Sequence, residues 1–259
     1  QGFVVQISTS SDFANPSTQT FPANTTEGSI TGLLNNTTYW FRMFAYNSYG
    51  NSGYSNVISA TTSSIYFENA PKIDSGEVHT CAIKTDNSLW CWGLNDYGQL
   101  GDETTLNKSN PVQILQDVSS VSLGWEHTCA IKTDKSLWCW GNNWDGQLGD
   151  GTNANNKSNP VQILQGVSSV SLGGSHSCAI NTDKSLWCWG DNLYRQLGDG
   201  TTADKSTPVQ ILQSVSSVSL GYTHTCAIKT DNSLWCWGDN RYGQLGDETT
   251  LNKSNPVQI

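Results

Sequence analysis

The stretch His-Thr-Cys-Ala-Ile-Lys-Thr-Asp-Asn-Ser-Leu-Trp-Cys-Trp-Gly occupies residues 79–93, and the chain repeats it three more times with few changes. The further copies occupy residues 127–141, 176–190 and 224–238, so successive copies begin 48 or 49 residues apart. A fixed period of this length is typical of a repeat architecture, in which each repeat forms one supersecondary unit that stacks on its neighbours. This stretch therefore decides the fold of most of the chain.

Each period contains four short strand-like segments and one long loop. In the second copy we expect strands at residues 111–115, 118–123, 127–132 and 136–140. Ser, Thr and Asn dominate the polar residues and Gly occurs 24 times, which agrees with a β-rich protein that has many turns. Four antiparallel strands and a loop per period describe a propeller blade, so we predict an all-β fold.

Each copy carries two cysteines ten residues apart, and the four copies contain all eight cysteines of the chain. If residues 85–87 form a three-residue hairpin loop, Cys81 lies opposite Cys91 on the neighbouring strand. Opposed residues at a non-hydrogen-bonded pair have Cα atoms about 4.5 Å apart, which a disulfide tolerates. We predict four disulfides of this kind: Cys81–Cys91, Cys129–Cys139, Cys178–Cys188 and Cys226–Cys236.

The register of this hairpin leaves alternatives open. A two-residue turn would place Cys81 opposite Trp92 and prevent the bond. The third loop residue needs a left-handed backbone, which suits Asn87 and Asn232 better than Lys135 and Lys184. Buried free thiols are a second possibility, and a metal site formed with the nearby His is a third, although the spacing lacks a Cys-x-x-Cys knuckle.

The segment Cys-Trp-Gly-Leu-Asn-Asp-Tyr-Gly-Gln-Leu-Gly-Asp at residues 91–102 closely resembles the RCC1-type repeat. The resemblance covers residues 63–259 and departs at Arg195, where the other copies have Gly98, Gly146 and Gly243. It implies a β-propeller, a fold that in this family generally closes with seven blades. We expect four four-stranded blades, at residues 63–110, 111–159, 160–207 and 208–255, and then the first strand of another, as part of a larger ring.

Residues 1–62 lack the repeat and form a separate region with strands expected at residues 2–8, 28–33, 39–46 and 56–61. The segment from Gly32 to Tyr39 and the following strands resemble the second half of a fibronectin type III domain. Leu33 and Tyr39 match its tyrosine corner, in which a Tyr hydroxyl bonds back to the preceding loop. The first two strands of that family are absent, so we expect a fragment of a β-sandwich with an open edge that a neighbouring subunit could complete.

Composition narrows the function classes. The chain has 13 Lys and Arg against 22 Asp and Glu, a formal net charge of −9, which argues against nucleic acid as a partner. No apolar run approaches the ~18–20 residues of a membrane helix, so we expect no membrane span. No nucleophile–base pair, catalytic carboxylate pair or phosphate loop is recognisable, and we expect no enzyme activity, cofactor or metal.

Residues that the four copies do not share are the best candidates for interactions, because the framework does not dictate them. The repeated His and the Trp pairs are more simply explained as framework residues that fill the space between blades. The candidate interaction residues in loops are Tyr97, Trp125, Trp144, Tyr194, Tyr222, Arg241 and Tyr242. Possible glycosylation sequons begin at Asn24, Asn35, Asn36, Asn107, Asn156 and Asn252.

Paired cysteines in every repeat indicate an oxidising compartment, so we expect an extracellular or cell-surface protein of microbial origin. The leading hypothesis is a non-enzymatic adhesion or structural scaffold that can self-assemble. The alternative is a secreted binding module for a protein, as in an inhibitor, or for a cell-surface glycan. Guanine-nucleotide exchange, which the RCC1 resemblance also implies, fits less well because four disulfides disfavour the reducing cytosol.

Overall fold

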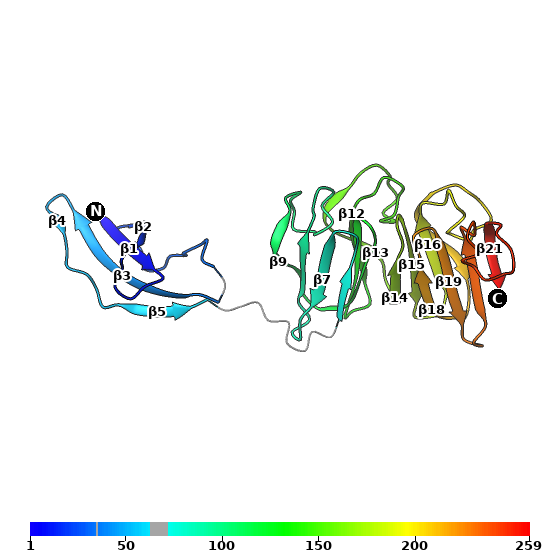
Figure 1. Cartoon of the computed structure of the whole chain (residues 1–259), viewed down its shortest axis with the longest axis horizontal. Coiled ribbons are helices and arrows are strands. Elements are labelled where there is room, and N and C mark those ends of the chain that lie inside the picture. Colours follow the sequence, from blue (N-terminus) through cyan, green and yellow to red (C-terminus); the bar gives the residue numbers. More distant parts are fainter. Residues whose placement is uncertain (35, 63–71) are drawn as a thin grey trace. The chain divides into compact units, whose positions relative to one another are not determined.

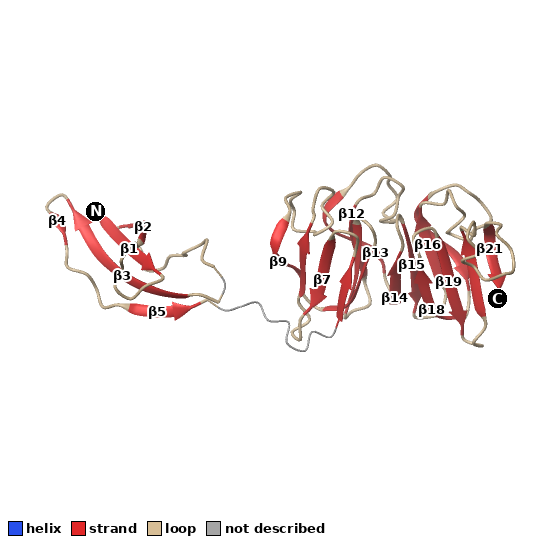
Figure 2. Cartoon of the chain, in the orientation of Figure 1, coloured by secondary structure: helices blue, strands red, loops and turns tan. Residues whose placement is uncertain are grey.

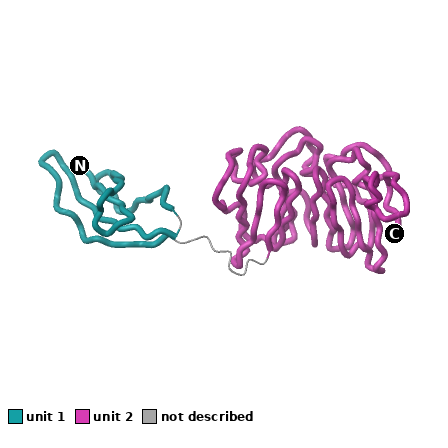
Figure 3. Tube along the Cα trace, viewed as in Figure 1, with its two compact units in different colours: residues 1–66 teal, residues 67–259 magenta. Residues whose placement is uncertain are grey.

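The computed structural model describes residues 1–34, 36–62 and 72–259, and the chain divides into two compact units, Gln1–Tyr66 and Phe67–Ile259 (Figure 3). The described residues of both units form strands and loops only, as Figure 2 shows. The domain boundary expected at residues 62–63 and the start of the first repeat at residue 63 adjoin or lie in the segment 63–71, outside the described residues.

Residues 72–259 of the second unit form four antiparallel four-stranded sheets, which lie next to one another in chain order (Figure 1). In each sheet the strands follow the order of the sequence, and the inner strands β6, β10, β14 and β18 of successive sheets contact one another. The first two sheets are β6 (Lys72–Ser75), β7 (His79–Ile83), β8 (Leu89–Gly93) and β9 (Lys108–Leu115), then β10 (Val118–Leu123), β11 (His127–Lys132), β12 (Leu137–Gly141) and β13 (Lys157–Leu164). The last two are β14 (Val167–Leu172), β15 (His176–Asn181), β16 (Leu186–Gly190) and β17 (Lys205–Leu212), then β18 (Val215–Leu220), β19 (His224–Lys229), β20 (Leu234–Gly238) and β21 (Lys253–Gln258).

The sheet boundaries differ from the predicted repeats. Residues 111–115, expected to open the second blade, belong to β9, which pairs with β8 and completes the first sheet. Likewise, the residues expected to begin a fifth blade form β21, the fourth strand of the last sheet. A periodic sequence fixes the length of the repeat but not the residue at which a blade begins. In addition, the short link at residues 116–117 resembles a hairpin turn in sequence, although it joins two different sheets. The long loop at residues 94–107, expected to link two blades, instead connects strands of one blade.

The cysteine hairpins have the predicted register. Cys81 is the direct partner of Cys91, their Cα atoms are 4.1 Å apart, and the structure contains the bond between them and its three equivalents. The third loop residue is left-handed in every copy, with φ between 61° and 69° at Asn87, Lys135, Lys184 and Asn232. The pairing therefore follows from one loop length repeated four times.

The repeated His and the second Trp of each pair join neighbouring sheets. The hydroxyl of Thr128 donates to the carbonyl of Gln99 over 2.8 Å, so its oxygen accepts a bond from Nε2–H of His79, 2.9 Å away. The indole of Trp140, which is fully buried, donates to the same carbonyl over 3.0 Å. His127 and His176 repeat the arrangement with Ser177 and Thr225 of the next sheet. These residues build the framework, as the sequence indicated.

The first unit is a single antiparallel sheet with the order β2–β1–β3–β4, and β5 also pairs with β3. Its strands are β1 (Gly2–Ser8), β2 (Ser17–Pro22), β3 (Thr38–Asn47), β4 (Gly50–Asn51) and β5 (Ile58–Thr61). The strand predicted at residues 28–33 is wrong, because this segment has no strand, and β2 was not predicted. The polar sequence Ser-Thr-Gln-Thr-Phe-Pro of β2 lies mostly exposed at the sheet edge, where burial imposes no apolar alternation.

The tyrosine-corner bond expected in this unit is present, since the hydroxyl of Tyr39 accepts from the backbone N–H of Leu34 over 2.9 Å. No second sheet that would complete a sandwich is present among the described residues of the unit. One face of the sheet carries a hollow of about 580 Å³ lined by apolar side chains, including Val5, Phe41 and Ile58.

Candidate functional site

The second unit has two chemically different ends. The tight turns between the disulfide-bonded strands lie at one end, which we call the turn end. At the other end, which we call the loop end, the short inner loop and the long loop of each sheet are joined by backbone bonds, such as that from the N–H of Asn142 to the carbonyl of Glu126 at 2.9 Å. All seven candidate interaction residues lie in these inner and long loops, at the loop end.

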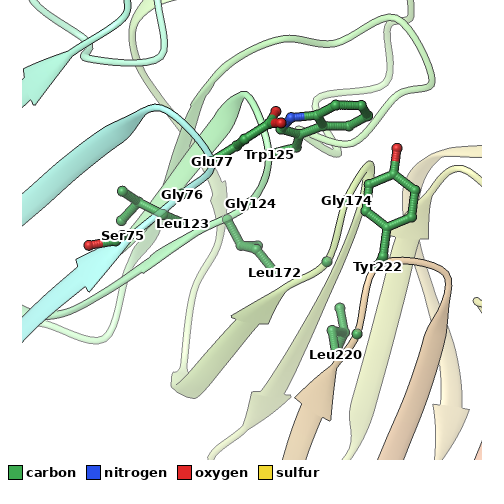
Figure 4. A pocket seen from close by; sticks show the side chains of 12 residues that line it. Ser75, Gly76, Glu77, Leu123, Gly124, Trp125, Leu172, Gly174, Leu220 and Tyr222 are labelled. Atoms are coloured by element: carbon green, nitrogen blue, oxygen red, sulfur yellow. The ribbon is translucent and has the colours of Figure 1, made fainter. Parts of the chain in front are cut away.

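The inner loops converge on a pocket of about 390 Å³ (Figure 4). Each contributes a Leu-Gly-x or Ser-Gly-x segment to the lining, and the residue after the Gly differs in every copy. The four residues at this position, which we call the variable column, are Glu77, Trp125, Gly174 and Tyr222. One pocket thus gathers residues from four sheets at a repeat position where each copy has a different residue.

The Gly that precedes each variable residue is required by close packing against the His of its own sheet and, in the first three sheets, by the approach of the next sheet. A Cβ on Gly124 would lie 2.2 Å from the ring of His127 and 2.7 Å from the carbonyl oxygen of Gly173. Gly173 has the same relation to His176 and to Gly221. The pocket therefore rests on a fixed backbone rim, above which only the variable residues project.

Trp125 and Tyr222 meet across this rim, although they belong to the second and fourth sheets. Their ring centroids are 5.1 Å apart with an interplanar angle of 66°, an edge-to-face pair. Gly174 of the intervening sheet lies beneath them: the N–H of Trp125 donates to the carbonyl of Gly174, and the N–H of Gly174 donates to the carbonyl of Tyr222. A Cβ on Gly174 would come within 2.8 Å of the Tyr222 ring, so the pairing depends on glycine there.

Negative charge surrounds this aromatic pair. Partial burial raises the pKa of the Tyr222 hydroxyl, and the nearby charges of Glu77, Asp191 and Glu126 raise it further. Burial also raises the pKa of Asp145 and that of Asp191, and the charge of Asp204 adds to the rise in both. The centre of the loop end is therefore electronegative.

The remaining candidate residues lie farther from the pocket. The guanidinium of Arg241 lies 4.7 Å from the ring centroid of Tyr194 and forms a 2.9 Å ion pair with Asp239. None of Tyr97, Trp144 and Tyr242 is among the described residues that line the pocket, and the last two are strongly exposed, at 62% and 87%. The structure thus brings Trp125 and Tyr222 together, and the other candidate residues are not among the described residues that line the pocket.

The sequons in the long loops coincide with a framework bond. The side-chain oxygens of Asn107, Asn156 and Asn252 each accept from the backbone N–H of an Asn in the same loop, at 2.7–2.9 Å. In the third copy Asp204 accepts the same bond, over 2.8 Å, without a sequon. An acceptor oxygen therefore explains the residue type at this position. Asn24 and Asn36 have left-handed backbones in the first unit, and the Asn35 sequon lies outside the described residues.

The acidic residue of each long loop is also part of the framework. Asp102 accepts from Asn95 and pairs with Lys108 at 2.9 Å, and the other copies repeat the arrangement. Within the described ranges no group of three or more His, Cys, Asp or Glu is arranged to hold a metal ion. The same residues include no helix long and apolar enough to cross a membrane.

The sequence matches the RCC1-like domain over residues 44–259, from within β3 to the end of β21 and beyond. This match spans most of the chain and agrees with the four repeated sheets. The chain belongs to the RCC1-like domain family. No curated protein matches this RCC1-like chain in sequence.

Three solved structures share the fold. Human WBSCR16 is 22% identical with a TM-score of 0.66, and the alignment covers 73% of this chain and 52% of that one. Yeast RCC1 (Prp20), solved bound to Kap60, is 19% identical with a TM-score of 0.67, covering 86% and 57%. A second Prp20p structure, from Saccharomyces cerevisiae and described with its binding to Gsp1p and histones, matches equally well over 86% and 61%. The chain spans between half and two thirds of the length of these proteins, and the likeness shows the fold.

Sequence reasoning missed two members of the variable column, Glu77 and Gly174. The signal was available, because both occupy the repeat position of Trp125 and Tyr222 and differ between copies. Sequence reasoning favours aromatic residues for their chemistry, whereas the members of the column have in common their place in the lining of the pocket. Asp145 and Asp191 were missed because charge at the loop end depends on how neighbouring sheets approach.

Proposed function

We propose that this chain is a non-enzymatic binding scaffold that works outside the cell and holds a partner protein at its loop end. One observation carries the proposal: four nearly identical repeats differ in the residues that surround one pocket, where Trp125 and Tyr222 stand exposed as a pair. Exposed aromatic residues on a rigid rim are typical anchors of protein interfaces. The structural neighbour Prp20p is described as binding Gsp1p and histones, which supports protein binding as a use of this fold.

The four disulfides support the location. Seven of their eight cysteines are buried and Cys226 is half-buried. Disulfides persist in secreted and cell-surface proteins rather than in a reducing cytosol. The first unit is proposed to be a fibronectin type III-like fragment that acts as a spacer, on the strength of the Tyr39 bond to Leu34. A mass measurement without reductant on protein from its native source tests the location, because eight free thiols would contradict it.

Self-assembly is proposed as part of the scaffold role. Ile228 and Leu234 of the last sheet are 41% and 38% exposed, whereas their equivalents Ile180 and Leu186 are covered by the next sheet at 1% and 0%. On the first sheet Ile73 is 67% exposed. A face of the first kind packs on a face of the second kind at every internal junction, so each end face suits a further sheet, supplied by more of the same chain or by a second copy. Light scattering tests self-assembly separately from partner binding, since a chain that stays monomeric at high concentration would contradict self-assembly.

The binding proposal is tested with cells of the organism that produces the protein. Labelled protein should be retained saturably at the cell surface, and W125A/Y222A should reduce retention about tenfold, because anchors at an interface centre carry most of the affinity. The matched control K135N/K184N changes two exposed turn-end residues to the Asn of the other copies and should retain wild-type binding. Equal retention of all three proteins would contradict a role for the loop end.

Guanine-nucleotide exchange is the alternative that the RCC1-like fold leaves open, and polysaccharide binding through the aromatic pair is another. An exchange assay with a small GTPase separates the first, since a scaffold leaves nucleotide release at its intrinsic rate. A glycan array with the W125A/Y222A control separates the second.

A further inference from the structure

The pocket at the centre of the loop end has an unusual combination of groups. Of the described residues that line it, Glu77 is the only charged one, and Trp125 and Tyr222 supply the aromatic surface. Leu123, Leu172 and the equivalent Leu of the fourth sheet supply apolar lining (Figure 4). A volume of about 390 Å³ is small for a pocket that holds a whole ligand, but it has room for one long side chain.

The aromatic pair presents π surface to the solvent. Trp125 is 37% exposed and Tyr222 is 60% exposed. Both rings keep solvent-exposed surface beside this edge-to-face contact, and that surface is available to a ligand. The face of an aromatic ring attracts a cation, most strongly when the ring is a Trp.

The charges around the pocket lack cationic partners of their own. Glu77, Asp191 and Glu126 are the carboxylates near Tyr222, and among the described residues no ion pair joins any of them to a Lys or Arg. Arg241, which lies at the same end, is held by Asp239, and the guanidinium of Arg195 donates to the carbonyl of Asn252. The local field therefore favours a positive group supplied from outside the chain.

The loop end already contains one example of this chemistry. Arg241 lies over the ring of Tyr194, with its centroid 4.7 Å away, while Asp239 pairs with the same guanidinium. An aromatic face and a carboxylate together hold that cation. The pocket offers the same two elements, an aromatic pair and Glu77, with no cation of the described chain between them.

We propose that the pocket binds the cationic side chain of a Lys or Arg in a basic segment of the partner protein. This inference rests on the proposed binding function and names the chemistry of its central contact. The methylene stem of the side chain lies along the leucines of the rim, and its charged group lies between the aromatic pair and Glu77. Such side chains suit the site because an apolar stem and a charged head match its two parts.

The test uses a fluorescein-labelled tetralysine peptide and measures its anisotropy with the whole chain in 150 mM salt. We expect saturable binding that weakens about tenfold in W125A/Y222A, because the cation–π contacts are lost. E77Q should weaken binding about threefold, since one partly exposed charge is removed. E248Q removes the same charge from an exposed loop residue that does not line the pocket, and it should bind as the wild type does.

The design separates the inference from the proposed function. Equal loss in E77Q and E248Q would show general attraction to an acidic protein and overturn the pocket assignment. Binding of neutral cellotetraose that is lost in W125A/Y222A, together with no binding of tetralysine, would assign the pocket to a glycan instead. If tetralysine fails to bind while cell-surface retention still depends on Trp125 and Tyr222, the inference fails and the binding scaffold stands. The conservative variant W125F, which keeps a ring, should restore part of the affinity and excludes misfolding as the cause.

Discussion

The two ends of the propeller unit are built from the same repeat but differ in what they conserve among the four copies. At the turn end every copy has a Thr-Asp-x-Ser turn in which the Asp carboxylate accepts bonds from the Ser backbone and hydroxyl, as Asp134 does from Ser136. At the loop end the residue on the pocket rim is acidic, indole, glycine or phenol according to the copy. The comparison indicates that the repeated residues build the framework, while the differences between copies gather at the end where we propose that a partner binds.

A fall in pH should produce the largest loss of stability, because it acts on the buried histidines of the framework. Burial lowers the pKa of His79 to about 4 and those of His127 and His176 to about 3, from an ordinary value of 6.5. Below pH 6.5 these histidines therefore bind protons in the unfolded chain but not in the folded chain. Their contribution to the free energy of unfolding is at its full value above pH 6.5 and decreases as the pH falls towards 3–4. At pH 5 the loss is about 2 kcal/mol for each histidine.

Guanidinium unfolding at pH 7.5 and pH 5 measures this loss. The carboxylates whose pKa values are lowered do not take up protons in this interval, and the raised pKa values of Asp145 and Asp191 act in the opposite direction. An unchanged midpoint at the two pH values would show that the histidines are not buried between sheets.

Removal of one disulfide is the next largest change. C178A/C188A should lower the free energy of unfolding by about 2–3 kcal/mol, since the bond closes a short loop and both residues are fully buried. Tetralysine binding below the unfolding transition should not change, because the bond lies in the framework. Unfolding midpoints and anisotropy on the same sample check both statements. A loss of binding without a loss of stability would contradict the assignment of the disulfide to the stabilising framework.

Gly174→Ala should moderately reduce both the stability of the framework and peptide binding at the loop end. The new Cβ lies within 2.8 Å of the Tyr222 ring and 2.9 Å of its carbonyl oxygen, so we expect a loss of about 1 kcal/mol and a displaced ring. Near-ultraviolet circular dichroism and peptide affinity report the displacement. Thr202→Ala, which changes an exposed residue in the long loop of the same sheet, is the control. Identical behaviour of the two variants would mean that the aromatic pair does not depend on glycine.

The smallest effect is expected at Asn156. Asn156→Asp keeps the acceptor oxygen, as Asp204 does in the third copy, and should change the free energy of unfolding by less than about 0.5 kcal/mol. Asn156→Leu removes the acceptor and should cost about 1 kcal/mol. Thermal unfolding distinguishes the two variants, and equal losses would show that the side chain acts by another route.

The fold was largely predictable because the period and the hairpin register are local properties. The three-residue loop at residues 85–87 places Cys81 opposite Cys91, and that step needs no knowledge of distant contacts. The assignment of β9 to the first sheet was not predictable, because pairing across the long loop depends on how the sheets stack. In the first unit β2 was missed since an exposed edge strand carries no apolar pattern.

The site was predictable only in part, for a related reason. Trp125 and Tyr222 could be selected as exposed aromatic residues, but their contact spans three sheets and requires Gly174 between them. Glu77 occupies the same repeat position and was recognisable only as a member of the variable column. A comparison of repeat positions, rather than of residue types, would have found all four.

The division between a stabilising framework and a binding end is tested most directly by photo-cross-linking at matched positions. A benzoylphenylalanine replaces Tyr242 at the loop end in one protein and Lys135 at the turn end in another, and both residues are exposed. After illumination on producing cells, we expect cross-linked partner protein from the Tyr242 position and background yield from the Lys135 position. Equal yields from the two ends, or a higher yield from the turn end, would contradict the account.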